Sequence, residues 1–283
     1  MDKIAIVTDT NSGMTEEEAE DLGVHLLPMP FIINGTTYFE NLDLTQEEFY
    51  KYLEEGADLS TSQPAPGDLL ALWNKLLKSY DYILHIPMSS TLSSSTASAC
   101  MFAQEFNGKV LVADNKRISV SLQQAVRDAV TWKKEGLSAS EIRDRLEQTS
   151  NDANIYLSVD TLKYLKKGGR ITPAVAAIGS LFHMKPVLTF KNGDLGVFKK
   201  TRGRKSSWKN MLQAVKNDSQ TEYKGREVLY AAAYSGEPEL GKAWEAYIRE
   251  EFPEAQVSMT RLPLSISTHL GPGVCGIACM AKH

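Results

Sequence analysis

Short apolar runs alternate with amphipathic segments through the first half of the chain, and this alternation limits the fold more than any other feature. The runs are KIAIVTD (3–9), HLLPMPFII (25–33), YILHIPM (82–88) and KVLVAD (109–114). Their length and apolar content are typical of buried strands. Between the second and third runs, Leu69, Trp73 and Leu76 share one face of an amphipathic helix that can cover a sheet. The first half is therefore predicted to be an α/β domain with a mostly parallel sheet.

The second half of the chain has a different pattern. Asn192-Gly193 joins two strand-like runs in a predicted hairpin, and helical segments flank the run EVLYAAAYS (227–235). Two further apolar runs close the chain, which is typical of an α+β domain with antiparallel strands. A chain of 283 residues lies near the size at which single cores split. We therefore expect two domains, residues 1–154 and the smaller residues 155–283.

Local signals predict where several elements begin and turn. Three pairs have capping-box spacing and indicate helix starts: Thr15 with Glu18, Thr45 with Glu48, and Ser138 with Glu141. Asn34-Gly35, between PFII and TTYFE, predicts a tight hairpin appended to the first sheet.

Positive charge is concentrated in one segment. Residues 163–209 contain 12 Lys or Arg and one acidic residue, Asp194, which leaves 19 basic and 34 acidic residues elsewhere in a chain of net charge −4. A solvated face explains such a run, and so does an anionic ligand or an acidic partner. Nucleic acid is disfavoured as the partner, because the segment is expected to lack interleaved exposed aromatics and the whole chain is acidic.

Several classes of protein and site are excluded. No apolar run approaches the length of a membrane span, and Asp9 interrupts the first run before a signal-peptide core can form, so we expect a cytoplasmic protein. The histidines lack metal-ligand spacing, no P-loop occurs, and too little chain follows GPGVCG (271–276) for a dinucleotide-binding unit. We therefore expect neither a metal nor a cofactor. Cys100, Cys275 and Cys279 are expected to be buried free thiols.

Hydroxyl side chains are crowded into four turns. Three are expected beyond the carboxyl ends of the sheet strands, at residues 8–13 (TDTNSG), 60–67 (STSQPAPG) and 89–96 (SSTLSSST), and the fourth is residues 267–273 (STHLGPG). Each turn alone is typical of ordinary hydroxyl capping. Because ligands in open α/β sheets bind beyond the carboxyl ends of the strands, the four turns together predict one polar pocket between the domains. The helix start after residue 94 favours an anion there.

Two features leave alternatives open. Ser93, Asp9 and His269 could converge as a hydrolytic triad, although no G-x-S-x-G motif surrounds Ser93 and so many equivalent hydroxyls suit holding a ligand better than attacking it. Residues 172–186 (TPAVAAIGSLFHMKP) predict a buried core helix. Alternatively, the small residues of that run leave volume for a long apolar ligand; they are Ala174, Ala176, Ala177 and Gly179.

Seven motifs occur in one order along nearly the whole chain. They are IVTDTNSGM, TSQPAPGD, SSTLSS, YLKKGGRI, KPVL, TRGRK and HLGPGVCG. In these motifs the chain resembles the DegV family of bacterial fatty-acid-binding proteins. The resemblance implies two α/β domains, a buried fatty-acid tail, and a carboxyl group at the cleft between the domains. It also implies a non-catalytic carrier that presents the acid to a fatty-acid kinase subunit. That partner binds ATP and forms the acyl phosphate that feeds phospholipid synthesis.

The resemblance also assigns site residues by position. Thr61 with Ser62, and Ser93 with the Ser94 N–H, are implied to hold the carboxyl group, with His269 beside them from the other domain. Ser94 stands where the family usually has glycine, which allows a closer backbone approach. The head group is therefore expected to bind more securely to the Ser93 hydroxyl than to the Ser94 N–H.

Two arginines are assigned to the partner. Arg170 and Arg202 lie in the strongly basic segment, so we expect them to contact the docked kinase or the incoming phosphate, with Lys167, Arg204 and Lys205 as supporting charges. An acyltransferase is a further candidate partner. The competing hypothesis is an acyl hydrolase or acyltransferase that uses Ser93 as its nucleophile.

Overall fold

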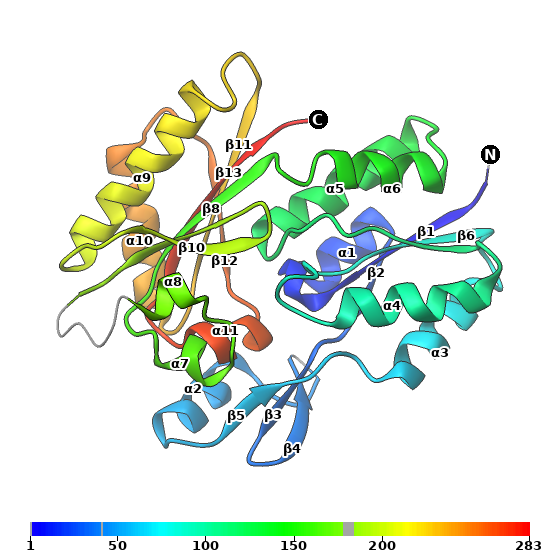
Figure 1. Ribbon diagram of the computed structural model, residues 1–283, viewed down its shortest axis with the longest axis horizontal. Coiled ribbons are helices and arrows are strands. Elements are labelled where there is room, and N and C mark those ends of the chain that lie inside the picture. Colours follow the sequence, from blue (N-terminus) through cyan, green and yellow to red (C-terminus); the bar gives the residue numbers. More distant parts are fainter. Residues whose placement is uncertain (1, 41, 178–183) are drawn as a thin grey trace.

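The computed structural model describes residues 2–40, 42–177 and 184–283, and three β-sheets lie within them (Figure 1). The first sheet has the order β2-β1-β6-β7, and all of its strand pairs are parallel. Its strands are β1 (Ile4–Asp9), β2 (Val24–Leu27), β6 (Tyr82–Ile86) and β7 (Val110–Val112). This sheet confirms the parallel α/β arrangement that the alternating sequence pattern predicts.

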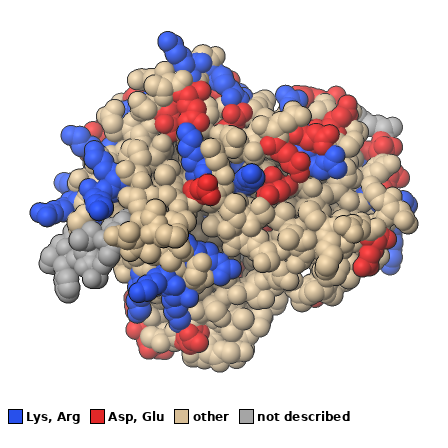
Figure 2. Space-filling model, viewed as in Figure 1, with Lys and Arg blue, Asp and Glu red and all other residues tan. Residues whose placement is uncertain are grey.

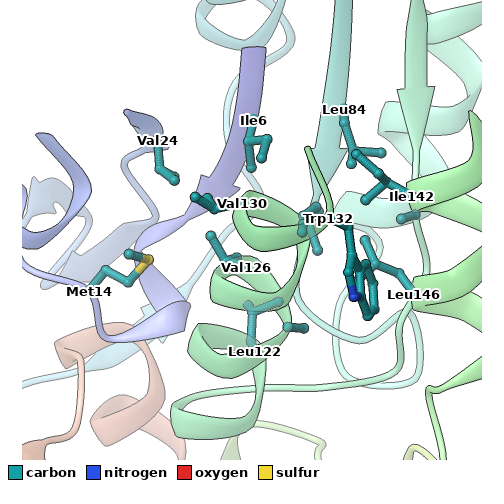
Figure 3. Close-up of a cluster of buried hydrophobic side chains, with 14 of the residues drawn as sticks. Ile6, Met14, Val24, Leu84, Leu122, Val126, Val130, Trp132, Ile142 and Leu146 are labelled. Atoms are coloured by element: carbon teal, nitrogen blue, oxygen red, sulfur yellow. The ribbon is translucent and has the colours of Figure 1, made fainter. Parts of the chain in front are cut away.

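Helices cover both faces of the first sheet. Successive residues of each strand point to opposite faces, and apolar side chains on both faces pack against helices. Ile6 and Leu84 pack with Val126 in one core, which Figure 3 shows between the strands and α5. Val7 and Ile83 pack in the opposite core. The helices on the first of these faces are α1 (Glu16–Leu22), α5 (Val120–Lys134) and α6 (Ala139–Gln148), and those on the second are α3 (Pro66–Leu76) and α4 (Ser95–Ala103).

A small antiparallel sheet of order β4-β3-β5 packs with one helix at the lower side of the view in Figure 1. Its elements are β3 (Pro30–Ile33), β4 (Thr36–Phe39), α2 (Gln46–Glu54) and β5 (Leu59–Thr61). The single run predicted over residues 25–33 is thus divided between two sheets, and Pro28, which has no N–H to donate, lies at the break. The hydroxyl turn at residues 60–67 consequently begins within β5 of the small sheet, not beyond a strand of the parallel sheet as expected.

The second half forms a six-stranded sheet of order β10-β9-β8-β13-β11-β12. Every pair is antiparallel except β11 with β12, which confirms the predicted antiparallel character. Its strands are β8 (Ala153–Ser158), β9 (Val187–Lys191), β10 (Asp194–Lys199), β11 (Val228–Tyr234), β12 (Val257–Arg261) and β13 (Cys275–Ala281). Trp208 of α9 (Arg204–Gln220) and Trp244 of α10 (Pro238–Glu251) fill the core on one face.

Three short helices lie toward the opposite face of this sheet. They are α7 (Lys163–Lys167), α8 (Pro173–Ala176) and α11 (Leu264–Leu270), and each contributes apolar side chains to one core. The buried helix predicted over residues 172–186 is wrong for the part that the structure describes. Only Val175 of α8 is buried, while Ala174, Ala176 and Ala177 are exposed, because this four-residue helix presents only the side of Val175 to the core. Gly179 lies outside the described residues.

The local signals have mostly correct outcomes. All three predicted capping boxes are present. Both Asn-Gly pairs form hairpin turns with positive φ at each residue, which asparagine and glycine tolerate. Cys275 and Cys279 are buried free thiols on β13, but Cys100 is exposed on the outward side of α4, so that prediction is wrong. The boundary between residues 154 and 155 stays a prediction.

Candidate functional site

The parallel sheet has a switch point between β1 and β6. From β1 the chain crosses to β2 on one side of the sheet, and it later returns to β6 on the other side. Such a reversal opens a crevice beyond the carboxyl ends of the strands. Asn11 follows β1 there, and the hydroxyl-rich residues 89–96 follow β6. The Thr91 hydroxyl donates to the carbonyl of Gly193 in the β9–β10 hairpin, so the turn also touches the six-stranded sheet.

A cavity of about 420 Å³ occupies this region and is lined by residues of both halves of the chain. Its size is within the usual range for small-molecule sites, about 300–1,000 Å³. The polar lining includes every residue predicted to hold the head group, together with one of the two arginines; they are Thr61, Ser62, Ser93, Ser94, His269 and Arg170. The apolar lining comes largely from the six-stranded sheet and α11; it includes Ile155, Leu157, Phe190, Ala233, Ile266 and Leu270.

Thr61 and His269 meet across the two halves. The Thr61 hydroxyl lies 2.7 Å from His269 Nε2. Thr61 ends β5 of the small sheet, and His269 is carried by α11, although the sequence indicated only a turn at residues 267–273. Helix α11 was missed because its β-branched residues have weak helix propensity and its start has no side-chain cap.

His269 is neutral near pH 7, because burial, and next the positive charge of Arg170, lower the pKa of His269 to about 4. Arg170 itself is exposed and lines the cavity. Its Nε donates to the carbonyl of Leu92 at 3.3 Å, and its Nη1 donates to the carbonyl of Gly168 at 2.6 Å. These two bonds place the guanidinium between the motif that contains Gly168 and the turn that contains Ser93.

Ser93 and Ser94 precede α4. The Ser93 hydroxyl oxygen accepts the N–H of Ser95 at 3.2 Å, which leaves its own hydrogen free to donate. Ser94 is exposed and has φ −73° and ψ −4°, a conformation that any residue adopts. The glycine usual at this position is therefore not required here by backbone conformation.

The remaining charged residues of the basic segment lie outside the cavity lining. Arg202 is exposed and pairs through a β-bridge with Met184. Lys167 is 2.5 Å from Asp58, and Arg204 is 3.5 Å from Asp160, while Lys205 is exposed. Figure 2 shows Lys and Arg gathered over α7 and the start of α9, and Asp and Glu over α5 and α6. Phe198 in this segment is 42% exposed, so the expectation that it lacks exposed aromatics is wrong at that position.

The described contacts do not assemble a Ser–His–Asp triad. His269 Nε2 faces Thr61, not Ser93. The Asp9 carboxylate accepts the N–H groups of Asn11 at 3.0 Å and Met88 at 2.8 Å, and burial raises the pKa of Asp9 to about 6. Asp9 therefore joins the ends of β1 and β6 and does not orient the imidazole.

Two polar pairs in the cavity lining were missed from the sequence. Ser265 donates to Asn11 Oδ1, and Ser98 donates to Gln63 Oε1 at 2.9 Å. The spacing of Ser265 and His269 places both on one face of a helix, but this signal has meaning only once α11 is known.

Within residues 2–40, 42–177 and 184–283, no group of three or more His, Cys, Asp or Glu side chains is arranged to hold a metal ion. No helix in the described part of the chain combines the length and the apolar character that a membrane span needs.

Comparison with known sequences gives one consistent result. The model of the DegV family, which is described as a family of uncharacterised proteins, matches residues 3–282. A DegV domain-containing protein of Listeria innocua is 31% identical over 293 residues, which cover 99% of this chain and 99% of the relative. A DegV domain-containing protein of Staphylococcus aureus is 31% identical over 283 residues and the full length of both chains.

Solved structures agree with these sequence matches. A DegV family protein from Thermus thermophilus, described by its fatty acid binding, is 30% identical with a TM-score of 0.90 and covers 99% of this chain and 100% of its own. Bacillus subtilis DegV, described as a fatty acid binding protein, is 29% identical with a TM-score of 0.87 over the full length of both chains.

Proposed function

Because the chain belongs to the DegV family, we propose that it binds one long-chain fatty acid with its alkyl tail in the cavity and its carboxylate at Thr61, Ser93 and His269. The observation that carries this proposal is that a single cavity of about 420 Å³ joins an extensive apolar wall to a group of hydroxyl donors. The fatty acid binding of the Thermus and Bacillus relatives supports it.

The tail supplies most of the affinity. Burying one methylene contributes about 0.8 kcal/mol, so a tail of roughly fifteen carbons gains on the order of 10 kcal/mol before the costs of association. The wall that receives it is made of strand residues such as Ile155 and Leu157, and side chains of α11 such as Ile266 cover it from the other side.

The carboxylate head group must be hydrogen-bonded in the protein, because the cost of removing it from water would otherwise cancel the free energy gained by burying the tail. Hydroxyls of Thr61 and Ser93 and the N–H of Ser94, at the start of α4, satisfy a carboxylate without a permanent cation in contact with it. Because His269 is neutral, it too adds no positive charge. The carboxylate oxygen then keeps its nucleophilic character.

We further propose that the protein is a non-catalytic carrier, which presents this carboxylate in the cytoplasm to a fatty-acid kinase subunit. The carboxylate oxygen attacks the γ-phosphorus of ATP held by that partner, ADP leaves, and the acyl phosphate feeds phospholipid synthesis through an acyltransferase. Arg170 supports this role because it is exposed and also lines the cavity. Arg202 is assigned to the outer part of the docking surface.

The test is lipid extraction followed by mass spectrometry of the purified protein. We expect long-chain fatty acid to co-purify, and delipidated protein to melt at a lower temperature until palmitate is added back, because a ligand of the folded state stabilises it. Absence of lipid, together with a melting temperature that palmitate does not change, contradicts the proposal. Hydrolysis of an acyl ester that Ser93→Ala abolishes favours the competing enzyme instead.

A further inference from the structure

Helices α7 and α11 approach each other closely through two glycines. A Cβ atom built on Gly168, which follows α7, would lie 2.1 Å from Nδ1 of His269 on α11. A Cβ atom on Gly271, which follows α11, would lie 2.2 Å from the ring of Tyr164 on α7. Each helix therefore sets an aromatic ring against the glycine at the end of the other, which ties the motif YLKKGGRI to the motif HLGPGVCG.

The two glycines are required for different reasons. Gly271 has φ 76°, a conformation that favours glycine whatever surrounds it. Gly168 has φ −76° and ψ −6°, which any residue adopts, so backbone conformation does not demand glycine there. The His269 ring is what fills the position of a side chain at residue 168.

This contact determines which nitrogen of His269 carries the proton. The neutral ring has a single N–H, and Nδ1 is buried against Gly168 with no hydrogen-bond partner among the described residues. Among these residues Nδ1 is unpaired in either tautomer, but a buried N–H without an acceptor is less tolerated than a buried acceptor without a donor. A proton on Nε2 instead donates to the Thr61 hydroxyl oxygen, 2.7 Å away.

The direction of this bond decides what Thr61 can do. A hydroxyl has one hydrogen to donate, and an oxygen that accepts from His269 leaves that hydrogen for another acceptor. In the opposite tautomer the Thr61 hydrogen would point to Nε2, and its lone pairs would repel a carboxylate. The Gly168 carbonyl also accepts from Arg170, so the same residue anchors the exposed cation beside the cavity.

We propose that Gly168 is a positioning residue of the fatty-acid site: by having no side chain it seats His269 in the Nε2–H tautomer and makes Thr61 a hydrogen-bond donor to the ligand carboxylate. This inference rests on the proposed function. It assigns Gly168 no contact with the ligand, because Gly168 acts through His269.

The first test needs no variant. Nitrogen-15 NMR of the imidazole distinguishes the two neutral tautomers, and we expect His269 to be protonated at Nε2 in the ligand-free protein at pH 7. Protonation at Nδ1 overturns the inference. Because this measurement uses no lipid, its result bears on the role of Gly168 and not on fatty-acid binding. Failure of the protein to bind palmitate at all would instead contradict the proposed function.

The second test is a double-mutant cycle with palmitate and 1-hexadecanol as probes. Gly168→Ala is expected to weaken palmitate binding about tenfold or more, as for loss of a hydrogen bond to a charged group, and to weaken hexadecanol binding less. In the His269→Ala background, where the ring is absent, adding Gly168→Ala should change palmitate binding by less than about twofold.

Gly67→Ala is the matched control, because no other part of the described chain beyond its own helix comes within 4 Å of a Cβ built there, and it should bind both probes as wild type does. Equal weakening of both probes by Gly168→Ala, or a full effect of Gly168→Ala in the absence of the His269 ring, contradicts the inference. If Gly168→Ala alone does not fold, the double variant and the tautomer measurement still decide.

Discussion

The carboxylate of Glu40 accepts the backbone N–H of Leu264 at 2.7 Å, although 224 residues separate them. Glu40 follows β4 of the small sheet, and Leu264 begins the helix that carries His269. The same carboxylate accepts from Gln46 of α2, whose amide also donates to the Leu262 carbonyl at 3.1 Å. The start of α11 is thus fixed by a carboxylate from another sheet, since no side chain of its own caps it.

Removing this contact should destabilise the protein and the site together. Glu40→Ala leaves the buried N–H of Leu264 without its acceptor, which costs about 1–3 kcal/mol of unfolding free energy. Chemical denaturation measures the loss, and palmitate binding should weaken as α11 loosens. Glu47→Ala is the control, because the Glu47 side chain that pairs with Arg261 is itself largely exposed, so its loss should change stability little. Equal stability of both variants would show that Glu40 does not fix α11.

His269 should make stability depend on pH. Its pKa is about 4 in the folded protein and near 6.5 when unfolded, so the unfolded chain binds more protons between these values. Stability therefore rises with pH from about 4 to 6.5, by up to about 3 kcal/mol, since one pKa unit corresponds to about 1.4 kcal/mol. His269→Asn should flatten this part of the unfolding free energy curve relative to wild type. Parallel curves for the two proteins would contradict the depressed pKa.

Loss of single hydroxyls at the polar part of the cavity should have moderate effects on ligand binding. Thr61→Val and Ser93→Ala each remove one donor, and a hydrogen bond worth about 1–3 kcal/mol corresponds to roughly 5- to 150-fold weaker palmitate binding. Ser90 lies in the same turn, but its hydroxyl bonds Asp114 and it is outside the cavity lining. The Ser90→Ala protein should therefore bind palmitate as wild type does. A Thr61→Val/Ser93→Ala protein that binds as wild type does would place the carboxylate elsewhere.

Charge reversal at Arg202 should separate ligand binding from presentation. Arg202 lies outside the cavity lining, so Arg202→Glu should bind palmitate normally but lose acyl-phosphate formation with the cognate kinase subunit. Arg170→Glu should also lose acyl-phosphate formation, and it should bind palmitate somewhat more weakly, because Arg170 lines the cavity. Arg143→Glu, on α6 where Arg143 pairs with neighbouring Asp144, is the control. Normal acyl-phosphate formation by an Arg170→Glu/Arg202→Glu protein would remove both arginines from the docking surface.

Elements with local signals could be predicted from the sequence, and elements set by distant contacts could not. The helix starts at Thr15 and Ser138 could be predicted, because a capping box is complete within four residues of sequence. Helix α11 has no such signal, and its start depends on Glu40 of another sheet. The hydroxyls of Thr61 and Ser93 stand out by composition. The apolar wall does not, because Ile155 has the same sequence pattern whether it lines a cavity or a packed core.

Strand β8 has one further consequence, for divergence among related proteins. Ile155 and Leu157 line the cavity, whereas Tyr156 between them packs in the core under α9 and bonds Asp218 at 2.8 Å. Along the six residues of β8, alternate side chains are thus constrained either by the cavity or by the core under α9. Substitutions on the cavity side can lengthen, shorten or bend the cavity while the opposite core stays unchanged, so, under the proposed function, preference for one acyl chain over another can change without loss of the fold.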